Sequence, residues 1–341
     1  MKVVRLLLFP FAVLYDLITS LRNFLFDISV FESTSFQIPV IVVGNLSVGG
    51  TGKTPQIEYL IRLLKDGFKV AVLSRGYKRE TKGFVLLNER YNALDVGDEP
   101  LQYFKKFEFI DVAVDANRVE GIQKLMKSTA PEIILLDDAY QHRKVKGSFY
   151  ILLTKYNDLF TDDFLLPTGN LRESRKGVQR ANIIVVTKCP FNLKEVEKEN
   201  IRKKLQRYKK KVYFSAISYA DKIAGNQNLS LDELKKFEVL LITGIANPSP
   251  LLEFLLKKEI KFTHLEFADH HHFSSKEIEG IQQKFSAITS DKKLILTTEK
   301  DYTRLVNRLD ELYFLEIETT FLEHQSQFDT VIKSHLHKYG V

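Results

Sequence analysis

The stretch GNLSVGGTGKTP, residues 44–55, directly follows the apolar run IPVIVV (38–43) and is the strongest indication of the fold class. From Ser47 to Thr54 it matches the phosphate-binding loop pattern G-x-x-x-x-G-K-[ST], except that Ser replaces the first Gly. A strand-like run precedes the loop, and Ile57, Leu60 and Leu64 give the segment after it a helical period. The alternative is a glycine-rich turn without a function, which the joint presence of strand, loop, Lys, Thr and helix disfavours.

The residue types in this loop suit a nucleoside triphosphate. Glycines let backbone N–H groups curl around phosphate oxygens. Lys53 is expected to reach the β- and γ-phosphates, and the Thr54 hydroxyl is expected to bind Mg²⁺. The nucleotide-binding residues expected here are Ser47, Val48, Gly49, Gly50, Thr51, Gly52, Lys53 and Thr54.

A second acidic element is needed for the metal. The stretch EIILLDDAYQHR contains an apolar run that ends in Asp137 and Asp138, which resembles the strand-end carboxylate of a Walker B element. The alternative is a pair of solvated acids in a turn. Which of the two acids lies nearer the metal stays open at this point.

The wider pattern alternates short apolar runs with helical periods, which predicts an α/β fold with a mostly parallel sheet. The pattern restarts after about residue 212. We therefore expect an N-terminal helix (1–26), a P-loop ATP-binding domain (27–212) and a smaller α/β domain (213–341) that closes over the cleft. The expected strands are 39–43, 69–73, 111–115, 132–137, 150–154, 182–187, 239–244, 262–267, 293–298 and 313–317.

The composition and net charge restrict the classes of partner that we expect the chain to bind. The chain has 341 residues, of which 44% are hydrophobic and 27% charged, as in ordinary soluble globular proteins. The formal net charge of +7 favours anionic partners, namely nucleic acid, phosphorylated molecules or an acidic membrane surface. The basic residues are spread out without a nucleic-acid motif, so nucleic acid is not expected. The single cysteine, Cys189, excludes an intrachain disulfide and suits a reducing compartment.

The first 26 residues, MKVVRLLLFPFAVLYDLITSLRNFLF, are unusually apolar. The run is too short to span a bilayer, because Asp16 interrupts it, and no small-residue cleavage site supports a signal peptide. We interpret it as a helix in a membrane interface, with Leu and Phe in the lipid and Lys2, Arg5 and Arg22 near phosphates. The alternative is an amphipathic helix that packs on its own domain.

Eight motifs, including the two already described, occur in order: VGNLSVGGTGKTP, LSRGYKRE, GDEP, DANR, LLDDAYQHR, PTGNLRES, FADHHHF and TTEKDYTRL. Together they make the chain resemble the tetraacyldisaccharide 4'-kinase family over nearly its whole length. The resemblance implies transfer of the γ-phosphate of MgATP to the 4'-hydroxyl of a membrane-embedded acylated glucosamine disaccharide 1-phosphate, giving the 4'-phosphorylated lipid IVA. The use of ATP and the single cysteine lead us to expect a site on the cytoplasmic face of the inner membrane, and no obligate protein partner is expected.

The resemblance also assigns roles to residues. Asp98 in GDEP matches the acid at the sugar hydroxyl, although its sequence context alone favours a helix N-cap. His270 in FADHHHF matches the histidine that partners this acid, so the two are expected to meet in an interdomain cleft. Arg118 and Arg172 match residues near the phosphates, and Glu173 matches a residue near the metal. Three adjacent histidines also invite a zinc interpretation, which their divergent directions in extended chain disfavour.

Three alternative functions remain open on sequence. A switch or metallochaperone NTPase would turn over ATP without lipid. A membrane-attached nucleotide-binding scaffold would bind ATP without transfer. A soluble small-molecule kinase would keep its activity when residues 1–26 are deleted.

Overall fold

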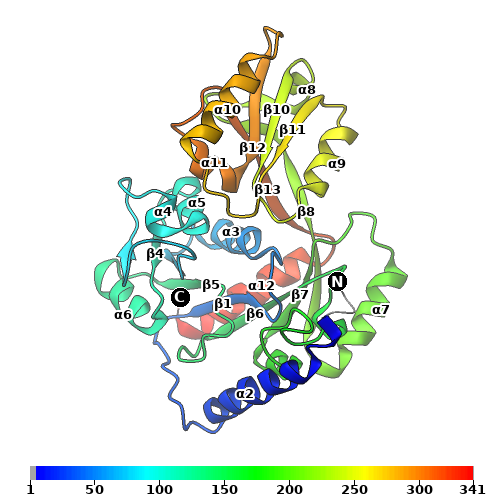
Figure 1. The fold of residues 1–341 in the computed structure, drawn as a ribbon. Helices are drawn as coiled ribbons and strands as arrows, with labels where there is room; N and C mark the ends of the chain where they lie inside the picture. The colour runs from blue at the N-terminus through cyan, green and yellow to red at the C-terminus, as the bar shows by residue number, and fades with distance from the viewer. Residues whose placement is uncertain (1–4, 341) are drawn as a thin grey trace.

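The computed structural model describes residues 5–340, whose strands form one continuous sheet through two units (Figure 1). The strand order is β11-β10-β12-β13-β8-β7-β6-β1-β5-β2-β4-β3, with β9 paired to β8. Among the described residues, the β3–β4, β8–β13 and β8–β9 pairs are antiparallel, and the others are parallel. Helices flank this sheet on both sides, which confirms the α/β class expected from the sequence.

Most strands agree with the expected apolar runs to within a few residues, although β13 is longer than expected. The strands that were not expected are β3, β8 and β9. The strands are β1 (Val40–Asn45), β2 (Val70–Ser74), β3 (Val85–Leu86), β4 (Asp111–Val114), β5 (Ile133–Asp137), β6 (Phe149–Lys155), β7 (Ile183–Thr187), β8 (Lys211–Ala224), β9 (Leu229–Ser230), β10 (Glu238–Thr243), β11 (Phe262–Glu266), β12 (Lys293–Thr298) and β13 (Leu312–Phe321).

The helices connect these strands and cover the sheet. The α-helices are α2 (Phe9–Asp27), α3 (Lys53–Leu64), α4 (Ala93–Val96), α5 (Asp98–Lys106), α6 (Arg118–Ser128), α7 (Glu195–Leu205), α8 (Leu231–Leu234), α9 (Ser249–Lys257), α10 (Ser275–Ser286), α11 (Glu299–Leu305) and α12 (Gln325–Leu336). Short 3₁₀ turns lie at Phe160–Asp162, Arg175–Arg180, Gln206–Tyr208 and His337–Tyr339.

The first unit buries its central strands on both faces. Alternate residues of β1 point to opposite sides, so Ile41 joins a core under α3, α5 and α12, while Val42 joins a core under α6. A third cluster packs under α7 and the loops around Phe160. Strands buried on both faces favour the continuous Val, Ile and Leu runs that the sequence contains.

The second unit is an insertion that the chain enters through β8 and leaves through β13. The first part of β8 pairs with β7 in parallel, and its remainder pairs with β13 in antiparallel fashion from Ser215–Phe321 to Ala224–Phe314. Two clusters fill this unit, one under α8 and α9 and one under α10 and α11. The two long strands therefore join the units as one ribbon of sheet (Figure 1).

The last helix returns to the first unit. Phe328, Ile332 and Leu336 on α12 are fully buried in the same core as the P-loop helix α3. The sequence-based division assigns all of residues 213–341 to the second unit, whereas this packing places α12 with the first. The chain thus crosses between the units twice, and Figure 1 shows α12 beside β1 and β6.

Helix α2 lies along the outside of the first unit with a polar side inward and an apolar side exposed. Tyr15 donates to the Arg172 carbonyl (2.8 Å), and Asn23 donates to the Glu173 carboxylate (3.0 Å). Arg5 donates to the carbonyls of Pro167 (3.2 Å) and Gly169, so it binds the protein itself rather than facing outward as expected. Lys2 lies outside the described residues. None of the helices within residues 5–340 has the length and apolar content needed to cross a bilayer.

Candidate active site

The P-loop leaves the carboxyl end of β1 in the middle of the first unit and leads into α3. Gly52 caps this helix in the left-handed region (φ 84°), where a side chain would be strained. Gly44 has no room for a side chain, because an added Cβ would lie 2.6 Å from the Cβ of Tyr140. These glycines let the loop turn tightly into α3. The unpaired N–H groups at the N-terminus of this helix can then bind a phosphate.

The register of the sheet brings the acidic pair beside this loop. Asp137 ends β5 and pairs with Val43 of β1, one residue before Gly44. Asp138 accepts from Arg172 (3.1 Å) and forms an ion pair with Lys53, whose Nζ lies 3.5 Å from Oδ1. The Walker B expectation and the P-loop expectation thus meet at the same edge of the sheet.

The two acids have different surroundings. Burial, followed by the charge of Asp138, raises the pKa of Asp137 to about 7. Its Oδ2 accepts from Ser74 (3.3 Å), while its buried Oδ1 has no hydrogen-bond partner among the described residues. Burial also opposes ionisation of Asp138, but Lys53 and Arg172 outweigh it and lower its pKa. A buried, unpartnered carboxylate oxygen beside a second carboxylate fits a divalent cation such as Mg²⁺.

The two arginines expected near the phosphates differ in exposure. Arg118, the first residue of α6, is buried and donates to the carbonyl of Asp115 (2.6 Å). Burial lowers its pKa to about 10 against the opposing charge of Asp137. Arg172 is partly exposed and bound to Asp138. Both guanidinium groups therefore lie close to the acidic pair.

The contacts of Glu173 do not support the expected metal role. Its two carboxylate oxygens accept from Arg180 (2.7 and 2.8 Å), and they also accept from Gln141 (2.9 Å) and Asn23. Its charge is therefore compensated by Arg180 in this arrangement. Glu173 joins helix α2 to the loops that flank the nucleotide site.

Asp98 and His270 meet across the two units. Asp98 is the first residue of α5, and the N-cap is Gly97 (φ 94°), so the Asp98 side chain does not cap the helix. His270 follows β11 in the second unit, with a left-handed backbone (φ 58°) held by the Gly244 carbonyl. The Nδ1 atom of His270 lies 2.8 Å from Oδ2 of Asp98. The structure thus brings together the two residues that sequence places 172 positions apart.

Two cations from α11 complete this pair and were not expected as site residues. Arg304 donates from Nε to Oδ1 of Asp98 (2.6 Å) and from Nη2 to Oδ2. Lys300 places its Nζ 2.9 Å from Nε2 of His270. Burial would raise the pKa of Asp98, but the bonds from His270 and Arg304 outweigh it and hold that pKa at about 2. The motif TTEKDYTRL contains both cations, but only the fold shows that they face Asp98.

Helix α5 connects the two halves of the site. Asp98 lies at its start, and Tyr103 lies one turn and a half further along, fully buried against the nucleotide side. Burial, followed by the charge of Asp137, raises the pKa of Tyr103, while the adjoining Thr54 hydroxyl opposes the rise. A movement of α5 would therefore displace both Asp98 and the Tyr103 side chain beside Thr54.

A buried ionic junction, formed by Glu58, Lys106, Glu299 and Glu316, lies where the units meet. Lys106 on α5 places its Nζ 3.0 Å from Glu58 on α3, 2.8 Å from Glu299 on α11 and 3.1 Å from Glu316 on β13. Burial and the negative charge of Glu58 raise the pKa of Glu299 to about 8. Three carboxylates thus share one ammonium group at the interface between the units.

The three histidines do not converge. His271 bonds Glu277 (2.9 Å), whereas His270 bonds Asp98. Within residues 5–340, Asp98, Glu99 and His270 do place possible ligand atoms within 4.8 Å of one another. However, the Lys300 ammonium already lies 2.9 Å from His270 and 3.7 Å from Glu99. A protein cation therefore occupies this position, and the cluster does not support zinc.

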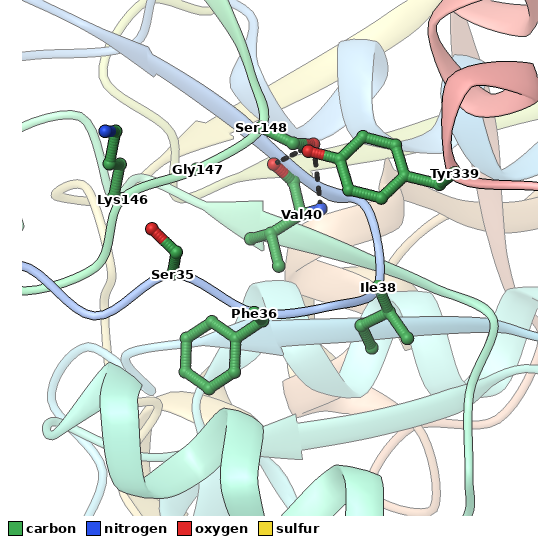
Figure 2. A pocket seen from close by; sticks show the side chains of 8 residues that line it. All are labelled: Ser35, Phe36, Ile38, Val40, Lys146, Gly147, Ser148 and Tyr339. Carbon is green, nitrogen blue, oxygen red and sulfur yellow. Dashed lines mark hydrogen bonds between the residues drawn. The ribbon is translucent and has the colours of Figure 1, made fainter.

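A small pocket of about 220 Å³ lies at the opposite edge of the sheet, at the amino end of β1 (Figure 2). Val40, Phe36 and Tyr339 contribute to its lining, and Ser148 Oγ bonds the backbone N (3.0 Å) and O (3.1 Å) of Val40. Since the P-loop leaves the other end of β1, this pocket is separate from the site. Parallel α/β sheets bind ligands at the carboxyl ends of their strands.

A P-loop at a central strand, an acid at the end of its neighbour and an Asp–His pair formed between the two units define a P-loop phosphotransferase. Comparisons with known proteins specify the family. A family model described as tetraacyldisaccharide-1-P 4'-kinase matches residues 4–337, and the chain belongs to this family.

Individual relatives agree with this membership. The chain is 54% identical over 341 residues to the tetraacyldisaccharide 4'-kinase of Flavobacterium johnsoniae, covering 98% of both chains. It is 46% identical to that of Bacteroides thetaiotaomicron, covering 93% of this chain and 89% of the relative. It also resembles the crystal structure of LpxK from Aquifex aeolicus in complex with ATP, at 30% identity and a TM-score of 0.80 over 98% of this chain and 99% of that one.

Proposed function

We propose that this protein is an ATP-dependent lipid kinase. It transfers the γ-phosphate of ATP to the 4'-hydroxyl of a tetraacyldisaccharide 1-phosphate, the reaction named for the family to which the chain belongs. The observation that carries the proposal is the contact between Asp98 and His270 (2.8 Å). It lies at the start of α5, the helix whose Tyr103 adjoins Thr54 of the P-loop. An NTPase that uses water has no need for a second unit that brings a histidine to Asp98.

The nucleotide side would bind and orient ATP. The P-loop residues 47–54 would surround the phosphates, and Lys53 would leave Asp138 to pair with them. Thr54, Asp137 and Asp138 would hold Mg²⁺, which reduces the negative charge on the β- and γ-phosphates when bound. Arg118 and Arg172 would stabilise the transferring phosphoryl group, since guanidinium groups match its planar charge.

The acceptor side would activate the sugar hydroxyl. The Asp98–His270 pair would take the hydroxyl proton as the oxygen attacks the γ-phosphorus in line. The two residues belong to different units and are in contact in this structure, so we propose that it represents the second unit closed over the cleft, as transfer requires. The cleft between the units is therefore the proposed place for the disaccharide headgroup.

The lipid substrate explains the exposed side of α2. Phe11, Leu14, Leu17 and Leu21 on α2 are each more than half exposed. Such a face stabilises insertion into a membrane interface by ~25 cal/mol per Å² of apolar surface buried. We propose that α2 binds an anionic membrane surface, on the cytoplasmic face of the inner membrane, where ATP and the headgroup meet. Its polar side, bonded to Arg172 and Glu173, would place that membrane next to the site.

Phosphate transfer from γ-labelled ATP to a tetraacyldisaccharide 1-phosphate in detergent micelles tests the function. We expect label in the lipid at the distal sugar and little release of inorganic phosphate without lipid. Equal release of inorganic phosphate with and without lipid, and no labelled lipid, would overturn the kinase proposal and favour an NTPase.

A further inference from the structure

We infer that Lys106 is a positioning residue for the acceptor side. Through the ionic junction it holds α11 against α5, and ionisation of the junction carboxylates weakens that hold. The inference rests on the proposed kinase function, because it concerns how the two units are kept together for transfer. It goes beyond that function by assigning a role to charged groups that lie away from the acceptor pair.

Helices α5 and α11 run in opposite directions and are joined by charged side chains at both ends. At one end, Arg304 near the end of α11 donates from Nε to Oδ1 of Asp98, the first residue of α5 (2.6 Å). At the other end, Glu299, the first residue of α11, lies 2.8 Å from Lys106, the last residue of α5. About 12 Å of helix separates Asp98 from Lys106. The ionic junction therefore fixes the same two helices from the end away from the acceptor pair.

The other partners connect the ionic junction to the P-loop helix and to the strand by which the chain leaves the second unit. Glu58 on α3 lies 3.0 Å from the Lys106 ammonium and accepts from Gln102 of α5 (2.7 Å). Glu316 lies 3.1 Å from the same ammonium, at the point in β13 where the pairing with β8 shifts register. Such an irregularity in a strand pair re-aims a side chain. One ammonium group thus joins α3 and α5 of the first unit to α11 and β13 of the second.

The ionic junction contains more negative than positive groups. Arg62 on α3 lies 3.8 Å from Glu58, but it also pairs with Glu318 of β13 (3.5 Å). Together with Lys106, two cations therefore face four carboxylates. The side chains of Glu58 and Glu299 are only 1% and 9% exposed, so water compensates little of the excess negative charge. Such an arrangement favours the protonated form of one of its carboxyl groups.

Proton binding agrees with this balance of charges. Burial raises the pKa of Glu58 against the charge of Lys106. Burial, with the charge of Glu58, raises the pKa of Glu299 to about 8, whereas a Glu299 separated from the other carboxylates would return toward 4.5. The assembled junction thus binds a proton more tightly, so its stabilisation is present below pH 4.5 and is lost as pH rises through 8. Between pH 7 and pH 9, the equilibrium shifts about tenfold toward separation of the units.

Lipid phosphorylation by Lys106→Met between pH 6 and pH 9 tests the inference. We expect kcat to fall by about 10²-fold at pH 9 with the KM for ATP unchanged, because the buried carboxylates lose their counter-charge while the P-loop stays within one unit. At pH 6, protonation of those carboxylates should restore most of the lost kcat. A loss of the same size at pH 6 and pH 9 would overturn the inference.

Lys105→Met is the matched control for this measurement. Lys105 precedes Lys106 on α5 but pairs with the exposed Glu89 (2.6 Å). This variant should match the unmodified protein at every pH. A loss of kcat shared by both variants would also overturn the inference.

A second substitution separates the effect of charge from that of packing. The double variant Lys106→Met/Glu299→Gln removes one buried negative charge together with the ammonium. It should recover about tenfold of the kcat that Lys106→Met loses at pH 9, because less uncompensated charge remains. A side chain that acts only by packing predicts no recovery, and that result would overturn the inference.

A distance measurement between the units gives a readout that needs no activity. Spin labels on Lys127→Cys of α6 and Lys258→Cys at the end of α9, both exposed positions, report the separation. Cys189 is buried, and burial raises its thiol pKa to about 12, so it should not take the label. We expect Lys106→Met to populate longer distances at pH 9 than at pH 6, and Lys105→Met to keep the short distance at both. Equal distances for the two variants at pH 9 would overturn the inference.

The two measurements distinguish failure of the inference from failure of the proposed function. If the distances change as expected but the unmodified protein phosphorylates no lipid, the kinase proposal fails, whereas the hold of the ionic junction on the two units stands. If Lys106→Met does not fold, as shown by loss of cooperative thermal unfolding, the double variant replaces it in both measurements. Glu58 and Glu316 remain uncompensated in that variant, so the same direction of pH dependence is expected.

Discussion

The nucleotide side and the acceptor side of the proposed site are built in different ways. The nucleotide side comes from the ends of neighbouring strands in one sheet, with Asp137 placed beside β1 by strand register. The acceptor side joins Asp98 from α5 in the first unit to His270 and α11 in the second. On the proposed assignment, nucleotide binding depends on one unit, whereas hydroxyl activation depends on how the two units are placed. Changes on the two sides should separate binding from transfer.

The largest expected effect breaks the nucleotide side. Lys53→Ala removes the ammonium that would neutralise the β- and γ-phosphates. We expect kcat/KM to fall by about 10³-fold, with weaker ATP binding, because a preorganised charge at the transferring group is lost. Lipid phosphorylation and ATP titration calorimetry measure the two effects. Unchanged ATP binding together with unchanged transfer would remove Lys53 from the site.

The second expected effect breaks the acceptor side alone. Asp98→Asn leaves the shape of the side chain but removes the charge that orients His270 and pairs with Arg304. We expect kcat to fall by about 10²–10⁴-fold, the range of acid–base catalysis, while ATP affinity stays unchanged. Loss of ATP binding instead would show that Asp98 belongs to the nucleotide side.

The third prediction concerns delivery of the lipid rather than either side of the cleft. Leu14, Leu17 and Leu21, changed together to Ser, should weaken binding to phosphatidylglycerol vesicles by about 10³-fold, since each loses apolar burial of ~1.5 kcal/mol. ATP binding should not change. Leu256→Ser is the matched control, because Leu256 is equally exposed (64%) but lies on α9 of the second unit. Equal vesicle binding by both variants would refute the membrane role of α2.

The smallest expected effect concerns the junction between the units. Burial, with the charge of Glu58, raises the pKa of Glu299 to about 8, above the ordinary value of 4.5. A raised pKa means that the folded state binds the proton more tightly, so stability from this group is present below pH 4.5 and is lost as pH rises through 8. Glu299→Gln should remove this loss and raise Tm by a few degrees at pH 9, with little change at pH 5. Thermal unfolding at the two pH values checks this, and an equal change at both would contradict it.

The sequence predicted the nucleotide side better than the acceptor side, for a physical reason. The P-loop and the acidic pair depend on local order, namely a strand, a turn and a helix start, which short patterns encode. Arg304 and Lys300 carry no local signal, because a cation on a short helix is ordinarily a solvated residue. Only the packing of α11 against α5 turns them toward Asp98.

For the fold as well, the sequence predicted elements that local patterns encode but not the packing of distant elements. The buried parallel strands were predicted because their apolar runs are continuous, as in Val40–Val43. Strand β8 was missed because its exposure changes along its length, from buried residues at 213–216 to exposed ones at 221–222. The return of α12 was missed because its Phe328, Ile332 and Leu336 stripe predicts a buried face but not which core receives it.

The paired strands β8 and β13 have a consequence for the modularity of the chain. The inserted segment begins and ends at neighbouring positions, since Ser215 pairs with Phe321, and its two cores draw only on residues between 219 and 315. A segment whose ends already touch can be replaced by a short turn without separating β7 from α12. We therefore expect that the smaller unit can be exchanged as a module, so that variation on the proposed acceptor side need not disturb the sheet that carries the P-loop.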